Sequence, residues 1–323
     1  MYTEAAVCEY LKEEIFPQLA TAPYGKIEVV MLAYSKPVYL FFEKTKNIIV
    51  VGKSFECEMI PVEEAWLLAD KEYLNLKLLR EKIGMCGDTD KVVAPLGENR
   101  ELSALLVTEW APGQTLDHYV TKAIYEQQRE KLFEQLNYLA RFFVKLHSTS
   151  ETDRPVSTDE PRWYLGTLLD SLSQSFLNPV DRATIEQYAV RWWNEDSIFA
   201  TDREVIVHGD ATPTNFLFDN GNVTGIDLEK MKWADRCWDL GFIAAELKHH
   251  FMWRMGDGWA AEPFIGHFLW EYAINYGDAS FFQTITRKIP LYMALGLLRI
   301  ARNNWLDEPY KRNLIAEAQQ CLK

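Results

Sequence analysis

The chain has 323 residues, of which 48% are hydrophobic and 13% aromatic, so it can bury a large core and is long enough for two lobes. Its formal net charge of -13 disfavours nucleic acid as a partner, because binding to phosphate backbones needs clustered Lys and Arg. Such acidity keeps a protein soluble and is compatible with a cationic substrate.

The N-terminal segment MYTEAAVCEYLKEEIF lacks the basic start and uninterrupted apolar region of a signal peptide. The longest apolar run, IPLYMALGLLRIA, is too short to span a bilayer. The five cysteines are odd in number and never form C-x-x-C, which indicates neither a disulfide framework nor a zinc site. We therefore expect a cytoplasmic protein without a membrane partner.

Residues 26–55 predict a three-stranded antiparallel meander, because IEVVMLAY, VYLFFE and NIIVVGKSF are rich in β-branched and aromatic residues and are separated by turn residues. After Pro61 the pattern changes to helical spacing and closes with Gly84, which predicts one long helix on this sheet. The apolar residues at that spacing are Trp66, Tyr73, Leu74 and Leu78.

The segment ALLVTEW predicts a further strand, which ends before Pro112 and Gly113. Helical patterns dominate the rest of the chain. In REKLFEQLNYLARFFVKLHS one stripe carries Leu132, Leu136, Leu139, Phe143 and His147. We expect an α+β fold with a small antiparallel-sheet lobe and one long helix in residues 1–110, and a larger, mainly helical lobe in residues 111–323. In an enzyme of this shape the cleft between lobes is the default site.

Residues 205–230, VIVHGDATPTNFLFDNGNVTGIDLEK, combine an apolar strand with a hairpin around DNGN. This hairpin should bring Asn215 and Asp227 toward Asp210. Carboxylate and amide oxygens suit Mg²⁺, and a third oxygen group that binds no metal can accept a proton from a hydroxyl. Phosphoryl transfer needs that division of labour, because positioning and charge neutralisation carry most of its catalysis.

The same stretch resembles the signature of the aminoglycoside phosphotransferase and choline kinase-like families, which share the two-lobed protein-kinase-like fold. The resemblance rests on four elements in order, namely His208-Gly209-Asp210, Asn215, Ile226-Asp227 and Trp238-Asp239-Leu240. Upstream, LARFFVKLHS and LLVTEW resemble a helix and the interlobe strand of these families. The matching features run from about residue 40 to residue 245.

The resemblance implies an ATP-dependent small-molecule kinase, which transfers the γ-phosphoryl group to a hydroxyl of an aminoglycoside-, amino alcohol- or sugar-like acceptor. By position, Asp210 resembles the catalytic Asp that orients or deprotonates the acceptor hydroxyl. Asn215 and Asp227 resemble the two Mg²⁺ ligands. His208 resembles a structural residue of the catalytic loop, and Asp239 a buried Asp that accepts hydrogen bonds from the loop backbone.

In the first lobe, Lys53 ends the strand NIIVVGK, where the phosphate-pairing Lys of this fold should lie. Glu72 on the following helix is the expected partner of its ammonium group. The alternative is that both are ordinary surface charges. The backbone of Thr108, Glu109 and Trp110 should bind the adenine ring.

The resemblance is incomplete. No G-x-G-x-x-G precedes Lys53, where the turn AYSKP stands instead, and Gly209 occupies a position at which protein kinases usually carry Arg. Both departures disfavour a protein kinase more than a small-molecule kinase. Glu229 resembles a Glu of choline kinase-like members, which either reaches metal or acceptor or pairs with Lys230 or Lys232.

Other interpretations stay open at this point. The acceptor should bind in the aromatic segment 246–278, where a cage for a quaternary ammonium, a floor for a sugar and simple core packing are alternatives. Its candidates are Trp253, Trp259, Trp270, Tyr272 and Tyr276. A catalytically silent kinase-fold protein that binds nucleotide or a protein partner is the competing hypothesis. A metal-dependent hydrolase built on His208 and Asp210 lacks further ligands such as H-E-x-x-H.

Overall fold

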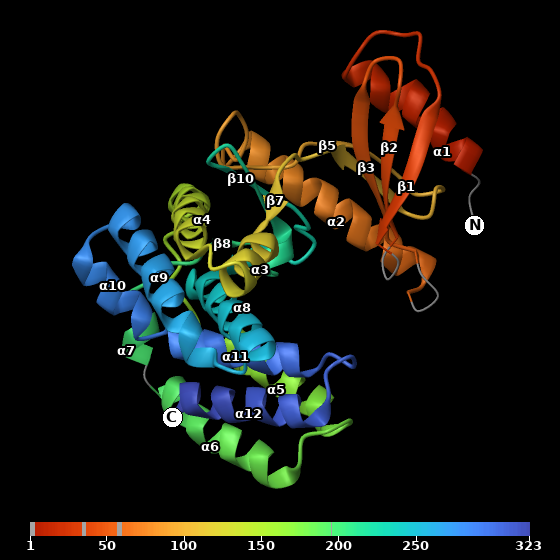
Figure 1. Ribbon diagram of the computed structural model, residues 1–323. Helices are drawn as coiled ribbons and strands as arrows, with labels where there is room; N and C mark the ends of the chain where they lie inside the picture. Colours follow the sequence, from red (N-terminus) through yellow and green to blue (C-terminus); the bar gives the residue numbers. More distant parts are fainter. Residues whose placement is uncertain (1–3, 34–36, 57–59, 195) are drawn as a thin grey trace. The chain divides into compact units, whose positions relative to one another are not determined.

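The computed structural model describes residues 4–33, 37–56, 60–194 and 196–323 and divides into two compact units (Figure 1). Unit 1 comprises Met1–Gly113 and Thr224–Lys230, and unit 2 comprises Gln114–Val223 and Met231–Lys323. Most of the predicted turn AYSKP, residues 34–36, lies outside the described residues. The functional division into residues 1–110 and 111–323 stays a prediction.

Unit 1 contains a five-stranded sheet with the order β1-β2-β3-β6-β5, in which every neighbouring pair is antiparallel. The predicted meander and the strand predicted at ALLVTEW are both confirmed as parts of this sheet. The strands are β1 (Ile27–Ala33), β2 (Val38–Glu43), β3 (Ile48–Ser54), β5 (Pro95–Asn99) and β6 (Leu105–Glu109).

One face of this sheet is covered by the N-terminal helical segment, α1 (Glu4–Tyr10), the π-helical turn η1 (Leu11–Ile15) and the 3-10 turn η2 (Phe16–Gln18). Their apolar side chains share a core with Phe41 and Val50. Successive residues of a strand point to opposite faces. Lys53, three residues after Val50 in β3, therefore lies on the face opposite this core.

Helix α2 (Val62–Glu81) confirms the predicted long helix, and it contacts β5, β6 and the short strand β4 (Lys91–Val92). The predicted apolar face was wrong, because Leu74 and Leu78 are 53% and 37% exposed. The buried face consists of Ala65, Ala69, Glu72, Leu76 and Leu79. Its small alanines allow a close approach of the helix, and this face carries Glu72 inward.

Unit 2 is mainly helical (Figure 1). Its helices are α3 (Leu116–Tyr125), α4 (Arg129–Thr149), α5 (Asp159–Ser173), α6 (Pro179–Asn194), α7 (Asp196–Phe199), α8 (Cys237–Met255), η4 (Gly258–Ala261), α9 (Glu262–Tyr276), α10 (Ala279–Thr286), α11 (Ile289–Ala301) and α12 (Glu308–Leu322). Short strands accompany them, namely β7 (Gln114–Thr115), which pairs with β9 (Phe216–Asp219), and β8 (Val205–Val207), which pairs with β11 (Lys232–Ala234). All five residues of the predicted stripe on α4 are buried.

Helix α8 lies in the interior of unit 2, because nearly all of its residues from Cys237 to Phe251 are buried. Such a helix is apolar around most of its circumference, as burial on several sides requires. Gly241 lets α11 approach it closely: a Cβ at Gly241 would lie 2.3 Å from the Cβ of Tyr292. This contact fixes the position of α11, whose last turn carries Arg299.

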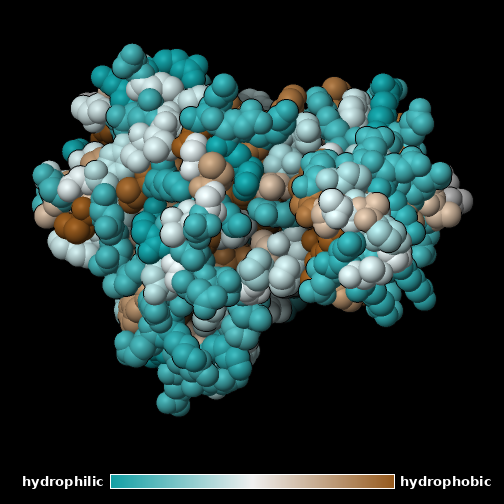
Figure 2. Space-filling model, turned by 90° about the horizontal axis from the view of Figure 1, so that it is seen from above, coloured by the Kyte–Doolittle hydropathy of each residue, from teal (hydrophilic) through white to brown (hydrophobic). Residues whose placement is uncertain are grey.

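Among the described residues, none of the helices combines the length and the apolarity needed to cross a bilayer. Hydrophilic residues cover most of the face in Figure 2, where hydrophobic residues form small separate groups.

The four cysteines that the structure describes are free thiols.

Candidate active site

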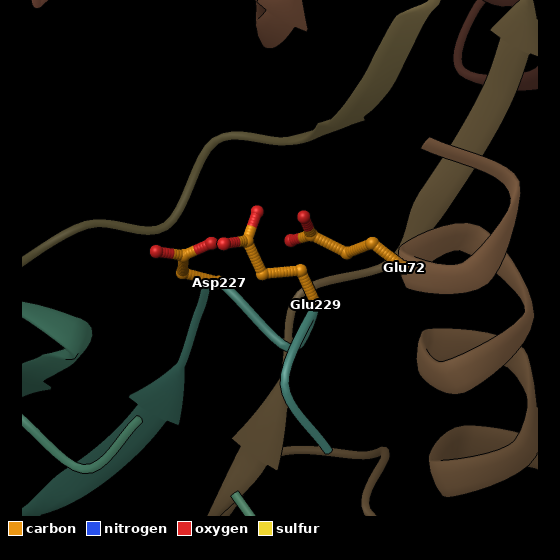
Figure 3. A group of neighbouring side chains, drawn as sticks. All are labelled: Glu72, Asp227 and Glu229. Atoms are coloured by element: carbon orange, nitrogen blue, oxygen red, sulfur yellow. The ribbon is translucent and has the colours of Figure 1, made fainter. Parts of the chain in front are cut away.

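Three carboxylates converge in unit 1. Glu72 comes from α2, whereas Asp227 and Glu229 come from the segment that follows β10 (Asn222–Gly225), and Figure 3 shows their carboxylates turned toward one another. Each offers an oxygen, and these oxygens lie within 4.8 Å of one another. A β-strand pairing places the segment here, because Thr224 and Gly225 pair in parallel with β4.

Helix α2 also fixes the backbone beside Asp227. The backbone N–H of Leu228 donates to Glu72 Oε1 at 3.2 Å, and the side chain of Asn75 donates to the carbonyl oxygen of Leu228 at 2.8 Å. Asp227 has φ of 62°, in the left-handed region that non-glycine residues rarely adopt. Strained conformations of this kind persist where the surroundings determine them and are concentrated at functional sites.

Lys53 joins the three carboxylates. Its Nζ lies 2.8 Å from Glu72 Oε2 and 3.3 Å from Glu229 Oε2, and it also donates to Asp227 Oδ1. Burial alone would lower the pKa of Lys53, but the three negative charges outweigh it and raise that pKa. Burial raises the pKa of Glu72, against the opposing effect of Lys53. The structure therefore brings together Lys53, Glu72 and Asp227.

The charges of this group fit a divalent cation. Three carboxylates and one ammonium leave two negative charges on a partly buried cluster, and buried charge is costly unless it is compensated. A hard cation such as Mg²⁺ prefers carboxylate oxygens and needs only one or two from the protein. Asp227 is the most accessible of the three, with a side chain 32% exposed compared with 4% for Glu72 and 7% for Glu229.

The residues predicted to bind adenine lie at the end of β6. Thr108 and Glu109 are its last two residues, and Trp110 follows with 42% of its surface exposed. Glu109 is tied to the preceding chain, because its backbone N–H donates to the Ala94 carbonyl and its side chain accepts from the Ala94 N–H, both at 2.9 Å. The binding of adenine at these residues stays a prediction.

In unit 2, the loop after β8 carries His208, Gly209 and Asp210. Gly209 has φ of 81°, which glycine adopts without strain. The carbonyl oxygen of Asp210 accepts a hydrogen bond from Asn215 Nδ2 at 3.0 Å. The hairpin thus brings Asn215 to Asp210, whereas the expected approach of Asp227 to Asp210 stays a prediction.

Asp239, in the first turn of α8, fixes this loop by accepting hydrogen bonds from its backbone. Its Oδ2 accepts from the His208 N–H at 2.7 Å, and its Oδ1 accepts from the Gly209 N–H at 3.0 Å. His147 Nε2 lies 3.3 Å from the same carboxylate, and His147 Nδ1 lies 2.9 Å from the Tyr272 hydroxyl. Burial lowers the pKa of His147, so the imidazole is neutral at pH 7. It connects the Asp239 carboxylate with the Tyr272 hydroxyl through hydrogen bonds.

Sequence reasoning missed two residues beside Asp210. Arg299 on α11 donates to Asp210 Oδ1 through Nη1, and through Nη2 to Glu246 Oε1 on α8 at 2.7 Å. Burial alone would lower the pKa of Arg299, but Glu246 and Asp210 raise it. One signal was present in the sequence: Arg299 is the only charged residue of the apolar run IPLYMALGLLRIA, and buried charges are normally paired.

The five aromatic candidates of the segment 246–278 do not form a single cage within the described part of the chain. Tyr272 and Tyr276 stack at 5.7 Å, and Trp270 packs on Phe282 at 5.4 Å. Trp259 is 73% exposed. Trp253 packs instead against residues outside the segment, with ring centroids 4.6 Å from Tyr310 and 5.7 Å from Trp305.

Comparison with solved structures shows the fold. The structure superposes on an ethanolamine kinase from Plasmodium vivax with a TM-score of 0.63 at 12% identity, covering 100% of this chain and 88% of that one. A choline kinase from Cryptosporidium parvum Iowa II gives 0.65 at 9% identity, covering 99% and 95%. The streptomycin–ATP ternary complex of APH(2")-IIa gives 0.60 at 14% identity, covering 99% and 97%. The predicted α+β, protein-kinase-like fold is confirmed.

Comparison of the sequence with curated proteins gave no match. The family model described as "Phosphotransferase enzyme family" matches residues 84–276, which is more than half of the 323 residues. The predicted relationship is therefore confirmed, and the chain belongs to the phosphotransferase enzyme family.

Proposed function

We propose that this phosphotransferase is a small-molecule kinase, which transfers the γ-phosphoryl group of ATP to a hydroxyl of an amino alcohol-, aminoglycoside- or sugar-like acceptor. The observation that carries the proposal is the cluster of Lys53 with Glu72, Asp227 and Glu229. A lysine paired with a glutamate, beside an aspartate whose oxygens can bind a metal, is the arrangement that phosphate binding and metal binding together require.

In the nucleotide-binding lobe, residues 1–110, Lys53 pairs with the phosphates while Glu72 fixes its position. The backbone of Thr108, Glu109 and Trp110 binds adenine. The ATP bound in the streptomycin complex named above supports ATP as the donor for this chain.

Mg²⁺ is the metal that this donor set fits. Asp227 would hold it together with Asn215, and Glu229 is a further oxygen donor beside Asp227. When bound, the cation neutralises charge on the nucleotide phosphates. The protein's contribution is to present hard oxygen atoms from a backbone that α2 keeps rigid.

In the catalytic lobe, residues 111–323, Asp210 orients the acceptor hydroxyl and takes its proton. The acceptor oxygen forms a bond to the γ-phosphorus, the bond to the β–γ bridging oxygen breaks, and ADP leaves with that oxygen. Asp239 and His208 keep the loop in place. The free cysteines support a reducing, cytoplasmic setting for this reaction.

The test is transfer of labelled phosphate from ATP to a panel of ethanolamine, choline, aminoglycosides and amino sugars. Asp210→Asn should reduce kcat by about 10²–10⁴-fold, the usual contribution of a positioned general base. Asp219→Asn, at the exposed hairpin turn, is the matched control and should leave kcat unchanged. Transfer that survives in Asp210→Asn at the parental rate would overturn the proposal, and ATP binding without transfer to any acceptor would favour the catalytically silent alternative.

A further inference from the structure

The C-terminal end of α11 places two arginines close together, Arg299 in its last turn and Arg302 as the C-cap residue. Arg299 and Arg302 are three residues apart, a spacing that puts side chains on the same helical face. Arg299 uses its two terminal nitrogens on Asp210 and Glu246. The charge of Arg299 is thus matched by carboxylates of unit 2.

Arg302 has no such match. Its side chain makes no hydrogen bond or ion pair with any residue that the structure describes, although the residue is half-buried and its Nε is fully shielded from solvent. The chain has 47 acidic and 34 basic residues, so acidic partners for Arg302 are plentiful. A shielded donor without an acceptor is rare in folded proteins and needs an explanation.

A tyrosine lies beside the two arginines. Tyr164 on α5 has its ring centroid 5.1 Å from that of Trp238 and 6.3 Å from that of Phe242, and the Arg299 guanidinium lies over Phe242 at 5.2 Å. Burial raises the pKa of Tyr164, and the charges of Arg299 and Arg302 oppose that rise without cancelling it. Its hydroxyl therefore stays protonated at neutral pH and is a donor.

Trp238 adds a further donor. It is 2% exposed, and its Nε1–H reaches no acceptor among the described residues. The neighbourhood of Asp210 thus contains shielded N–H groups, on Arg302 and Trp238, that find no oxygen within this part of the protein, together with the hydroxyl of Tyr164. An oxyanion is the ligand that such a set of donors satisfies best, because charge-assisted hydrogen bonds are the strong ones.

The local charge balance agrees with this chemistry. A chain of contacts joins Asp210, Arg299, Glu246, His250, Asp117 and Arg254. Burial, with the nearby Arg254, lowers the pKa of His250 to about 4, so this imidazole is neutral at pH 7. These six residues then carry three negative and two positive charges, and Arg302 supplies the third positive charge. The region is balanced before an acceptor enters, and an acceptor with both an amine and an oxyanion keeps it balanced.

We propose that Arg302 and Tyr164, next to Arg299, form a subsite for an oxyanion carried by the acceptor, so that the acceptor is a zwitterionic hydroxy compound. The inference rests on the proposed kinase function and deepens it. The shared chemistry is a carboxylate or phosphate group within reach of Arg302 when the acceptor hydroxyl is at Asp210. The acidic net charge of the whole chain is then a poor guide to the acceptor.

Matched pairs of ligands test the subsite by calorimetry with ADP and Mg²⁺ present, under conditions without turnover. The carboxylate arm compares serine with ethanolamine and homoserine with 3-aminopropan-1-ol. The phosphate arm compares glucosamine 6-phosphate with glucosamine. The acid member of at least one arm should bind roughly 10–100-fold more tightly, as expected for hydrogen bonds to a charged group, and the arm with this preference identifies the oxyanion.

Variants then assign the preference to the subsite. Arg302→Met should abolish it and leave the unfolding midpoint unchanged, because Arg302 has no protein partner to lose. Arg302→Lys should retain part of it, and Tyr164→Phe should weaken it. Arg312→Met is the control, since Arg312 is an exposed arginine of α12.

Three results would overturn the inference: equal binding of both members in every pair, an acid preference that survives in Arg302→Met, or an Arg302→Met variant that changes only the KM for ATP. The last result would assign Arg302 to the transferring phosphate. Failure of the kinase function is distinguishable, because acid-selective binding that depends on Arg302 without phosphate transfer to any acceptor would leave the subsite intact and refute the proposed reaction.

Discussion

Replacement of Lys53 by Met should destabilise unit 1 by about 3–4 kcal/mol at pH 7. The change leaves Glu72, Asp227 and Glu229 without their shared cation, and removal of one partner from a buried pair typically costs about 3–5 kcal/mol. The alternative to an unpaired charge is protonation of Glu72. Protonation at pH 7 of a carboxyl group with the ordinary pKa of 4.5 costs about 3.4 kcal/mol at 1.36 kcal/mol per pH unit. Asp227 adds less, because its side chain is 32% exposed and solvent screens it.

The pH dependence of this loss follows from the same group. In Lys53→Met the pKa of Glu72 in the folded state is raised above its unfolded value, so the folded protein binds more protons. Its stabilising contribution is present at low pH and is lost as pH rises through the folded pKa. The difference in unfolding free energy between parent and variant should therefore shrink from pH 7 to pH 5.5, by at most about 2 kcal/mol, because burial already raises the pKa of Glu72 in the parent.

Urea unfolding of the parent and of Lys53→Met at the two pH values measures both effects. Lys71→Met is the control, because Lys71 is exposed on the same helix one residue before Glu72, and it should change stability by less than about 0.5 kcal/mol. A loss below about 1 kcal/mol in Lys53→Met, or a loss that does not shrink at pH 5.5, would show that the Lys53 ammonium group does not stabilise the buried carboxylates.

Three further substitutions test hydrogen bonds, helix packing and a buried imidazole within unit 2. Asp239→Asn should cost about 2 kcal/mol, because two loop N–H groups lose a charged acceptor, and hydrogen exchange at those amides should accelerate; unchanged exchange would argue against this role. Gly241→Ala should cost about 1–3 kcal/mol in thermal unfolding because of the clash with Tyr292, whereas Gly266→Ala, whose Cβ meets no atom within 4 Å, should be neutral or slightly stabilising. Burial, with nearby positive charge, lowers the pKa of His249 to about 3 from the ordinary 6.5, so its stabilising contribution is lost as pH falls below about 6.5, and His249→Gln should reduce the slope of unfolding free energy against pH between 6 and 4 by about 1.4 kcal/mol per unit. An unaltered slope would contradict the burial of a neutral imidazole.

Local patterns predicted the elements that position the candidate site. The strand that ends near Lys53 and the helix that carries Glu72 are both encoded in short stretches with clear periodicity. The buried face of that helix was predicted incorrectly, because the pattern of large apolar residues points to Leu74 and Leu78, whereas the contact is made by Ala65 and Ala69. Small residues carry little hydrophobic signal, but they allow helix and sheet to approach closely.

The contacts of Asp210 could not be predicted in the same way. Arg299 is 89 residues away in sequence, and its position depends on the packing of α11 against α8, which Gly241 permits. Nothing within either helix specifies that partner. The third carboxylate of unit 1, Glu229, was similarly ambiguous, because a short segment with alternating acidic and basic residues allows several ion pairs.

The aromatic segment illustrates the same limit. Spacing along a chain shows which side chains share a helical face, but the partners of each ring come from other elements. Trp253 packs on Tyr310 of α12 and on Trp305 in the loop before it, and both residues lie outside the segment that the sequence singled out.

The most direct test of the central claim is thermal unfolding with a non-hydrolysable ATP analogue, with and without Mg²⁺, on the parent and on Asp227→Asn. Asn removes the charge but tolerates the left-handed backbone at this position. At about 100 times the dissociation constant, bound ligand should add about 2.7 kcal/mol of stability. We predict a stabilisation of the parent that requires Mg²⁺ and is lost in Asp227→Asn. Equal stabilisation of both proteins, or of neither, would contradict a metal–nucleotide site at Asp227.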